Sequence, residues 1–275
     1  MSTTLPTIPQ VRVAPARRPG QLGVLAAMLL LYGLSAAVYI VIPGGMLDPR
    51  SYEQLGMTPP ATTMPVWQLV LANVGLILVG YSLLGLVGYW LSQRAGLPGI
   101  YRLGAGWRAW AGRPLVLGVA AGVVLVGVDL AAQRLKGYPG SAHPPFPASI
   151  LASLSAGIGE EILNRLVFLS LWAVILTWLL RRLRPDNSLR RPALLIANVI
   201  AALVFAASHL PGAMMMTGVS TPAALPPVLL AEIFLLNGVV GLIAGEVYIR
   251  DGLVGASGVH FWCDVVWHVV YGLFR

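Results

Sequence analysis

Residues 159–165 read Gly-Glu-Glu-Ile-Leu-Asn-Arg, and an apolar run from Leu166 to Leu180 follows them. Two adjacent carboxylates and an arginine therefore stand at the head of a segment that is otherwise typical of a membrane span. An ionisable side chain at the centre of a bilayer costs about 2.5–3.5 kcal/mol on insertion scales. Either these three side chains are paired and line a polar cavity, or the segment does not span the membrane.

The composition of the whole chain is that of an integral membrane protein. Of its 275 residues, 57% are hydrophobic and only 10% are charged, whereas a soluble domain carries about 25% charged residues. The net charge of +8 is explained by basic cytoplasmic loops that set topology and contact anionic lipid. No stacking-aromatic motif or basic helix accompanies it. We expect the lipid bilayer as a partner and no nucleic acid.

Seven apolar segments are long enough to cross the bilayer, which takes about 20 helical residues. We predict an all-α polytopic membrane bundle of about seven transmembrane helices in a single domain, 22–275. A basic, disordered N-terminal arm is expected at 1–21. The predicted spans are 22–43, 66–92, 114–135, 147–180, 192–209, 225–249 and 252–274, and loops are expected at 44–65 and 210–224.

Arginine and lysine alternate between the two sides of these spans. The N-terminus and the loops on its side hold 13 of them, against four on the other side. Such a bias predicts a cytoplasmic N-terminus. We therefore expect an integral protein of the bacterial inner or plasma membrane.

Three pairs of residues within the spans, each with at least one ionisable member, are separated by four positions. This spacing places both members of a pair on one face of a helix. They are Glu161 and Arg165, Phe205 and His209, and His260 and Asp264. Carboxylates and imidazoles on three helices can bind and activate a water, with a glutamate as general base and histidines as donors or metal ligands. We expect Glu160, His209 and His260 to converge on one cavity, and Glu161 to pair with Arg165.

Other intramembrane residues are expected to be structural. The set comprises Asp129, Glu232, Glu246 near Arg250, His268 as an interhelical hydrogen-bonding group, and the glycines Gly238, Gly241 and Gly245 as helix-packing positions.

Three classes of membrane protein share some of these sequence features. Residues 255–258 match the Gly-x-Ser-Gly of a rhomboid-type serine protease, but no span follows the seventh to carry a base histidine. A proton-coupled transporter also uses intramembrane carboxylates and histidines, yet the polar residues here concentrate after residue 147. A third alternative, which the sequence does not exclude, is a non-catalytic membrane scaffold or immunity protein with the same helical fold.

The three motifs in this order resemble the CAAX-protease and bacteriocin-processing (CPBP, or Abi) family of intramembrane proteases. That family shows Glu-Glu-x-x-x-Arg, then Phe-x-x-x-His, then His-x-x-x-Asn/Asp, each on its own helix. The matching positions are Glu160, Glu161, Arg165, Phe205, His209, His260 and Asp264. The resemblance covers a catalytic core at 147–270. It departs from the family pattern at Asn164 and Leu166, beside the arginine, and Asp264 replaces the commoner asparagine.

The resemblance implies an intramembrane endopeptidase, similar to CAAX prenyl endopeptidases, that acts on a membrane-associated peptide or protein. It implies that Glu160 activates a water, that Glu161 and Arg165 support it, and that His209, His260 and Asp264 position it. Because the family is usually classed as metal-dependent, a divalent metal, zinc first, would be held by Glu160, His209, His260 and Asp264. The charge bias and the residue depths favour a cavity that opens away from the cytoplasm.

Overall fold

The computed structural model describes residues 20–53, 63–136, 143–184, 186 and 188–274. Within these residues the chain is helical and contains no β-strand. Seven helices in this described part of the chain are long and apolar enough to cross a membrane, which confirms the predicted all-α bundle. Residues 1–19 of the predicted arm lie outside the described part, and Gln21 already belongs to the first helix.

Each predicted span corresponds to one helix or to a helix with a π-helical section. In chain order the elements are α1 (Gln21–Val41), α2 (Pro49–Glu53), α3 (Val66–Leu76), η1 (Ile77–Tyr81), α4 (Ser82–Arg94), η2 (Arg108–Gly112), α5 (Arg113–Lys136), α6 (Ala148–Glu161), η3 (Ile162–Leu169), α7 (Ser170–Leu183), α8 (Arg190–Ala207), α9 (Leu210–Thr217), η4 (Pro222–Ala224), α10 (Pro227–Asp251), α11 (Leu253–Asp264), η5 (Val265–Val270) and η6 (Tyr271–Phe274). Of these, η1, η2, η3 and η5 are π-helical, and η4 and η6 are 3₁₀ turns.

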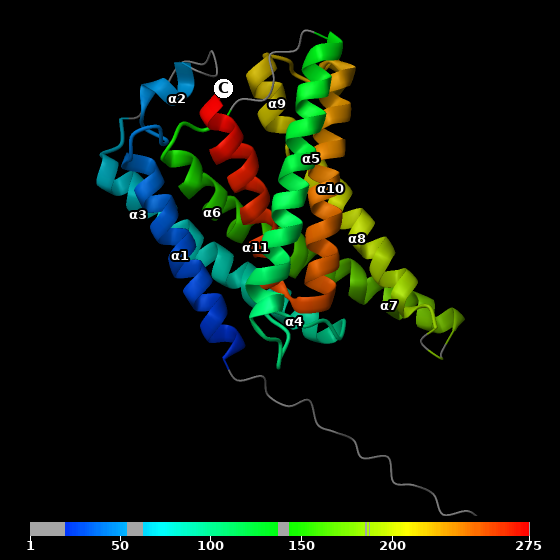
Figure 1. Ribbon diagram of the computed structural model, residues 1–275. Helices are drawn as coiled ribbons and strands as arrows, with labels where there is room; N and C mark the ends of the chain where they lie inside the picture. The colour runs from blue at the N-terminus through cyan, green and yellow to red at the C-terminus, as the bar shows by residue number, and fades with distance from the viewer. Residues whose placement is uncertain (1–19, 54–62, 137–142, 185, 187, 275) are drawn as a thin grey trace, which may run out of the picture.

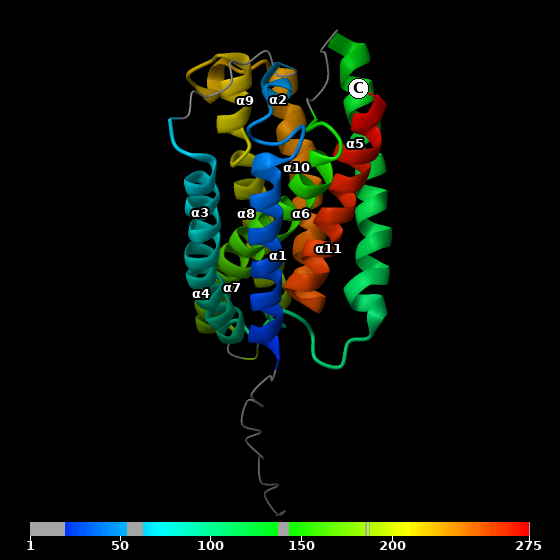
Figure 2. The same cartoon turned by 90° about the vertical axis from the view of Figure 1, so that its left-hand side faces the viewer.

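Successive spans run in opposite directions along the bundle (Figures 1 and 2). Helix α1 begins at the lower end in Figure 1, and the C-terminus lies at the upper end. The two ends of the described chain are therefore on opposite sides, as an odd number of crossings requires.

Helix α11 occupies the inside of the bundle, where it packs against α5, α6 and α10. Half of the apolar window of this last span is buried, whereas only 11% of the α3–α4 window is. The α3–α4 span therefore presents most of its side chains to lipid, and the last span is enclosed by protein. This enclosure puts the residues of α11 in contact with those of α6.

The turn between α10 and α11 fixes where α11 begins. Gly252 has a φ of 94°, a value that glycine adopts without steric cost. A Cβ at this position would also lie 2.8 Å from the Cα of Tyr101. The first free N–H groups of α11, those of Leu253 and Val254, donate to the carbonyls of Gly99 and Ile100. The helix is therefore held at both its turn and its first backbone donors.

Small residues let the central helices approach closely. A Cβ on Gly157 would lie 3.2 Å from the backbone of α11, and a Cβ on Gly241 would lie 2.9 Å from Ala202 of α8. A Cβ on Gly245 would overlap the side chain of Asn198. The packing role predicted for these α10 glycines is confirmed at Gly241 and Gly245. It is wrong at Gly238, where no atom lies within 4 Å of the Cβ position.

Two local predictions were wrong. The loop expected at 210–224 contains α9 and the turn η4, because the residues after Pro211 are good helix formers with Pro at the first turn. The loop expected at 44–65 contains α2, and its residues 54–62 lie outside the described part. The structural role expected for Glu246 takes the form of an ion pair with Arg191 of α8, at 2.8 Å.

Candidate active site

The two adjacent glutamates lie at the end of α6 and have opposite environments. The side chain of Glu161 is 0% exposed, whereas that of Glu160 is 41% exposed. Since neighbouring residues on a helix point in directions about 100° apart, only one of them faces the protein interior. Glu160 is therefore the carboxylate that a substrate or water can reach.

Glu161 connects two other helical segments. Its Oε2 atom lies 3.2 Å from Nε of Arg165 on η3, and its Oε1 atom lies 2.9 Å from Nδ1 of His260 on α11. The predicted pair between Glu161 and Arg165 is present. The contact with His260 was not predicted, because sequence spacing gives no information about which helices are neighbours.

Arg165 is fully buried beside an aromatic ring. Its side chain is 0% exposed, and its guanidinium carbon lies 4.9 Å above the ring of Phe205. A cation over an aromatic face is stabilised by the ring quadrupole. Phe205 also contacts His209 and His260 edge to face, with ring centroids 5.0 Å and 5.6 Å away. Phe205 therefore brings the arginine and both histidines to one place.

His260 stands between the two glutamates and Asp264. Its Nδ1 donates to Glu161, so Nε2 points to the other side, 4.0 Å from Oε2 of Glu160 and 3.6 Å from Oδ2 of Asp264. Both distances exceed those of a direct hydrogen bond. A separation of this size between polar groups suits a bridging water.

His209 lies at the turn between α8 and α9. Its Nδ1 is 2.9 Å from the carbonyl oxygen of Phe205. A carbonyl only accepts, so Nδ1 carries the proton and Nε2 of the neutral ring is left as an acceptor. The side chain is half-buried. Among the described residues, the hydrogen-bond and ion-pair contacts of His209 are with backbone only, so its place beside Glu160 stays a prediction.

The four predicted metal ligands do not form a coordination shell as they lie. In the part of the chain that the structure describes, no group of three or more His, Cys, Asp or Glu side chains could hold a metal ion. Zinc in proteins needs ligand atoms at about 2.0–2.3 Å, and His260 is 3.6 Å or more from both Glu160 and Asp264. The predicted zinc therefore stays a prediction, and no chemical step below uses it.

The serine motif at 255–258 has a packing role instead. A Cβ on Gly255 would lie 2.9 Å from Val247, and one on Gly258 would lie 2.8 Å from Pro114. The Oγ of Ser257 is buried and has no hydrogen-bond partner among the described residues. No hydrogen bond therefore joins Ser257 to His260 in the described part of the chain, whereas a serine nucleophile and its base lie within hydrogen-bond reach.

A second polar cluster lies apart from these residues. The Asp129 carboxylate accepts from Tyr271 at 2.7 Å and from Gln133, and Glu232 lies beside it. Nδ1 of His268 lies 3.2 Å from Nδ1 of His143. The predicted hydrogen bond of His268 is therefore present, but its partner lies in the loop before α6 and not on another helix. Structural pairing, as predicted for Asp129, accounts for these contacts.

Two features of the site were missed. Tyr32 of α1 lies against α6, where a Cβ on Gly159 would be 2.7 Å from its ring. The π-helical segments η3 and η5 begin directly after Glu161 and Asp264. π-Helical turns are frequent at functional sites. A tyrosine in a generic apolar span and an i→i+5 turn leave no distinctive sequence signal.

One comparison with known proteins gives a match. Residues 142–266 match the family model of type II CAAX prenyl endopeptidases, Rce1-like. These residues are an Rce1-like domain. No curated protein and no solved structure matches the chain.

The Rce1-like domain includes α6 to α11 and therefore all six predicted site residues. The match supports, in general terms, an intramembrane endopeptidase of the CAAX-protease type. The helices α1 to α5 lie outside the matched residues, yet Tyr32 of α1 and Pro114 of α5 pack directly against the domain.

Proposed function

We propose that the protein is an intramembrane endopeptidase in which Glu160 is the general base that activates a water for attack on a peptide bond. The observation that carries the proposal is the unequal exposure of the two glutamates, 41% for Glu160 and 0% for Glu161. A general base must reach the water it deprotonates. Glu161, which is tied to Arg165 and His260, cannot do so without breaking both contacts.

The roles of the other residues follow from their contacts. Glu161 fixes the His260 ring through Nδ1, so Nε2 is directed at the space beside Glu160 and Asp264. A water in that space would lie within reach of Glu160 and His260 together. Glu160 takes its proton as the oxygen attacks the scissile carbonyl, and it later gives that proton to the leaving amine. We propose that Nε2 of His209, left as an acceptor, orients the water or the substrate amide.

We propose that the substrate is a membrane-associated peptide or protein, because the site lies within helices that cross the bilayer. The family model refers to CAAX prenyl endopeptidases, so a prenylated peptide is the first substrate to test. A divalent metal at Glu160, His209, His260 and Asp264 is the alternative means of activating the water.

The test uses the full-length protein reconstituted in liposomes with farnesylated and unmodified fluorogenic peptides. We expect Glu160→Gln to reduce cleavage by about 10²–10⁴-fold, the usual contribution of a general base, while the protein elutes as a folded species. Glu246→Gln is the matched control, since that glutamate pairs with Arg191 far along α10 from the site. Full activity in Glu160→Gln would overturn the proposal.

Metal analysis of the same preparations separates the two means of activation. A stoichiometric metal in the wild type that is lost in His209→Ala and His260→Ala would favour the metal alternative. Cleavage that survives prolonged chelation would favour activation by the side chains alone.

We also propose that the N-terminus is cytoplasmic in a bacterial plasma membrane. The support is the bias of arginine toward the end of the bundle that carries the α4–α5 and α7–α8 loops. Cysteines introduced at Glu53 and Ser188, at opposite ends, test it on a Cys263→Ser background. An impermeant thiol reagent should label position 53 in intact cells and position 188 only after permeabilisation. The reverse pattern would contradict the assignment.

A further inference from the structure

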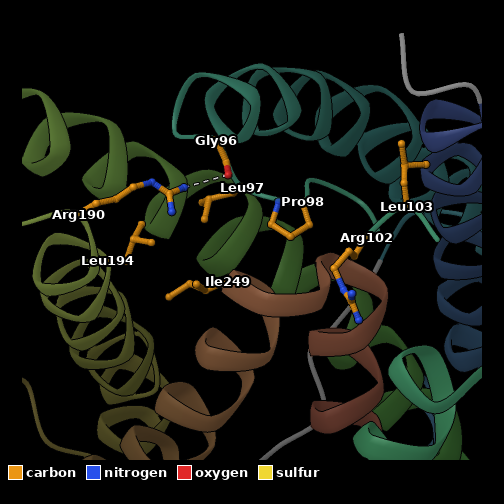
Figure 3. Close-up of a pocket in the computed structure, with 8 residues that line it drawn as sticks. All are labelled: Gly96, Leu97, Pro98, Arg102, Leu103, Arg190, Leu194 and Ile249. Carbon is orange, nitrogen blue, oxygen red and sulfur yellow. Dashed lines mark hydrogen bonds between the residues drawn. The ribbon is translucent and has the colours of Figure 1, made fainter. Parts of the chain in front are cut away.

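A cavity of about 280 Å³ lies at the arginine-rich end of the bundle, away from the glutamates. It is formed by the loop that follows α4, the start of α8 and the end of α10 (Figure 3). The residues that line it are Gly96, Leu97, Pro98, Arg102, Leu103, Arg190, Leu194 and Ile249. Nothing in the proposed protease mechanism uses this cavity.

The two arginines of the cavity carry more positive charge than their partners neutralise. Arg102 lies 3.1 Å from Asp251, and Arg113 also pairs with Asp251, so one carboxylate serves two guanidinium groups. Arg190 donates to the carbonyls of Ala95 and Gly96, at 3.2 Å and 3.0 Å. These acceptors are neutral, and no ion pair of Arg190 occurs among the described residues. The cavity therefore has a net positive charge.

The rest of the lining is apolar. Leu97 and Leu194 are 1% and 3% exposed and form the inner wall, whereas Leu103 is 44% exposed at the mouth. Figure 3 shows Arg190 and Arg102 on opposite sides of Leu97 and Pro98. A ligand for this site needs a negative group that both arginines can contact and an apolar part that follows the leucines.

This end of the bundle has the features of a membrane–water interface. The exposed tryptophans Trp90, Trp107 and Trp178 lie here, at 54%, 68% and 56% exposure. Two of them stack with arginines, Trp90 with Arg94 at 5.0 Å and Trp178 with Arg182 at 4.0 Å. Tryptophan and arginine gather at the headgroup level of a bilayer. The cavity is therefore at the depth of phospholipid headgroups.

We propose that this cavity binds the phosphodiester headgroup of an anionic glycerophospholipid. Arg102 and Arg190 contact the phosphate, and the acyl chains leave past Leu103 along the lipid-facing surface. Basic pockets between transmembrane helices are known to hold anionic headgroups. The volume accommodates a headgroup but is below the range of about 300–1,000 Å³ that encloses a whole drug-sized ligand. The site is a structural lipid site at the junction of α4, α8 and α10.

The test measures lipid binding to the delipidated full-length protein by native mass spectrometry and by thermal unfolding. Phosphatidylglycerol is the probe, with phosphatidylcholine and inorganic phosphate as the other arms. A basic residue near an anionic surface contributes about fivefold in affinity. We therefore expect the affinity for phosphatidylglycerol to fall about fivefold in Arg102→Gln or Arg190→Gln, and about 25-fold in the double variant. Arg108→Gln, an exposed arginine outside the cavity lining, is the matched control and should keep wild-type binding.

A further variant keeps both arginines, so it tests the site even if the arginine variants misfold. Leu103→Trp fills the exposed mouth of the cavity and should lower phosphatidylglycerol binding as well. Equal binding by the wild type and the double arginine variant would overturn the proposal. So would an equal loss in Arg108→Gln, equal binding of phosphatidylcholine, or saturation by inorganic phosphate at the lipid's concentration.

Discussion

Replacement of Glu161 by glutamine, which exchanges only the carboxylate for a neutral amide, should destabilise the fold. The glutamine has the same shape but leaves the Arg165 guanidinium without its counter-charge. Both side chains are 0% exposed and lie 3.2 Å apart. Removal of one member of a buried ion pair costs about 3–5 kcal/mol. The Phe205 ring remains beneath the guanidinium in the variant and continues to stabilise the cation, so we take the lower end of this range. We therefore expect unfolding to become about 3 kcal/mol easier.

The assay is reversible unfolding of the purified protein in mixed micelles, followed by far-ultraviolet circular dichroism. Glu160→Gln is the control, because its side chain is 41% exposed and such changes usually stay within about 0.5 kcal/mol. The double variant Glu161→Gln/Arg165→Met removes the buried charge altogether. Replacing a buried pair by apolar groups is often neutral, so the double variant should recover most of the loss. The coupling between the two positions then follows from a double-mutant cycle.

Two results would refute the reasoning. A stability of Glu161→Gln equal to that of Glu160→Gln would show that Arg165 does not depend on this carboxylate. A double variant that loses the sum of the two single losses would show that the two residues act independently, despite their 3.2 Å contact.

Three further predictions concern packing and the second polar cluster. Gly159→Ala should lower activity and stability because its Cβ meets the Tyr32 ring at 2.7 Å, and Tyr32→Ala should restore thermal stability if that clash is the cause. Gly245→Ala should lower unfolding free energy by about 1–3 kcal/mol, since it displaces Asn198 from its hydrogen bond to α10; unchanged stability would contradict this close packing. Glu232→Gln should keep or raise thermal stability, because it removes a charge from a 5% exposed side chain beside Asp129; a marked loss would mean that the charge has a cation partner.

The sequence was sufficient for the number of spans and the pairing within a helix. Apolar length and the alternation of arginine depend only on local composition, so the seven crossings were predictable. The Glu161–Arg165 pair was predictable because a spacing of four fixes geometry within one helix. For Glu246, which lies one turn from Arg250, the sequence predicted only a structural role. Its ion-pair partner, Arg191, comes from a neighbouring helix, which spacing along one helix does not reveal.

Contacts between helices were not predictable from the sequence alone. The hydrogen bond from His260 to Glu161 joins residues 99 positions apart, and it depends on how α11 packs against α6. That packing depends in turn on Gly157 and on the turn at Gly252. Neither glycine is distinguishable, in a chain with 31 glycines, from those that have no neighbour at all, such as Gly238.

The different roles of the two glutamates follow from their adjacency. Side chains at consecutive helical positions diverge by about 100°, so the direction that turns Glu161 into the bundle turns Glu160 toward the open side. Among the described residues, His260 is the one basic side chain with nitrogen atoms within 4.0 Å of both carboxylates. Its Nδ1 proton is already committed to Glu161, so only Nε2 can respond to a proton taken up by Glu160. The buried carboxylate therefore sets the orientation of the ring, and the exposed one exchanges protons with the reacting water.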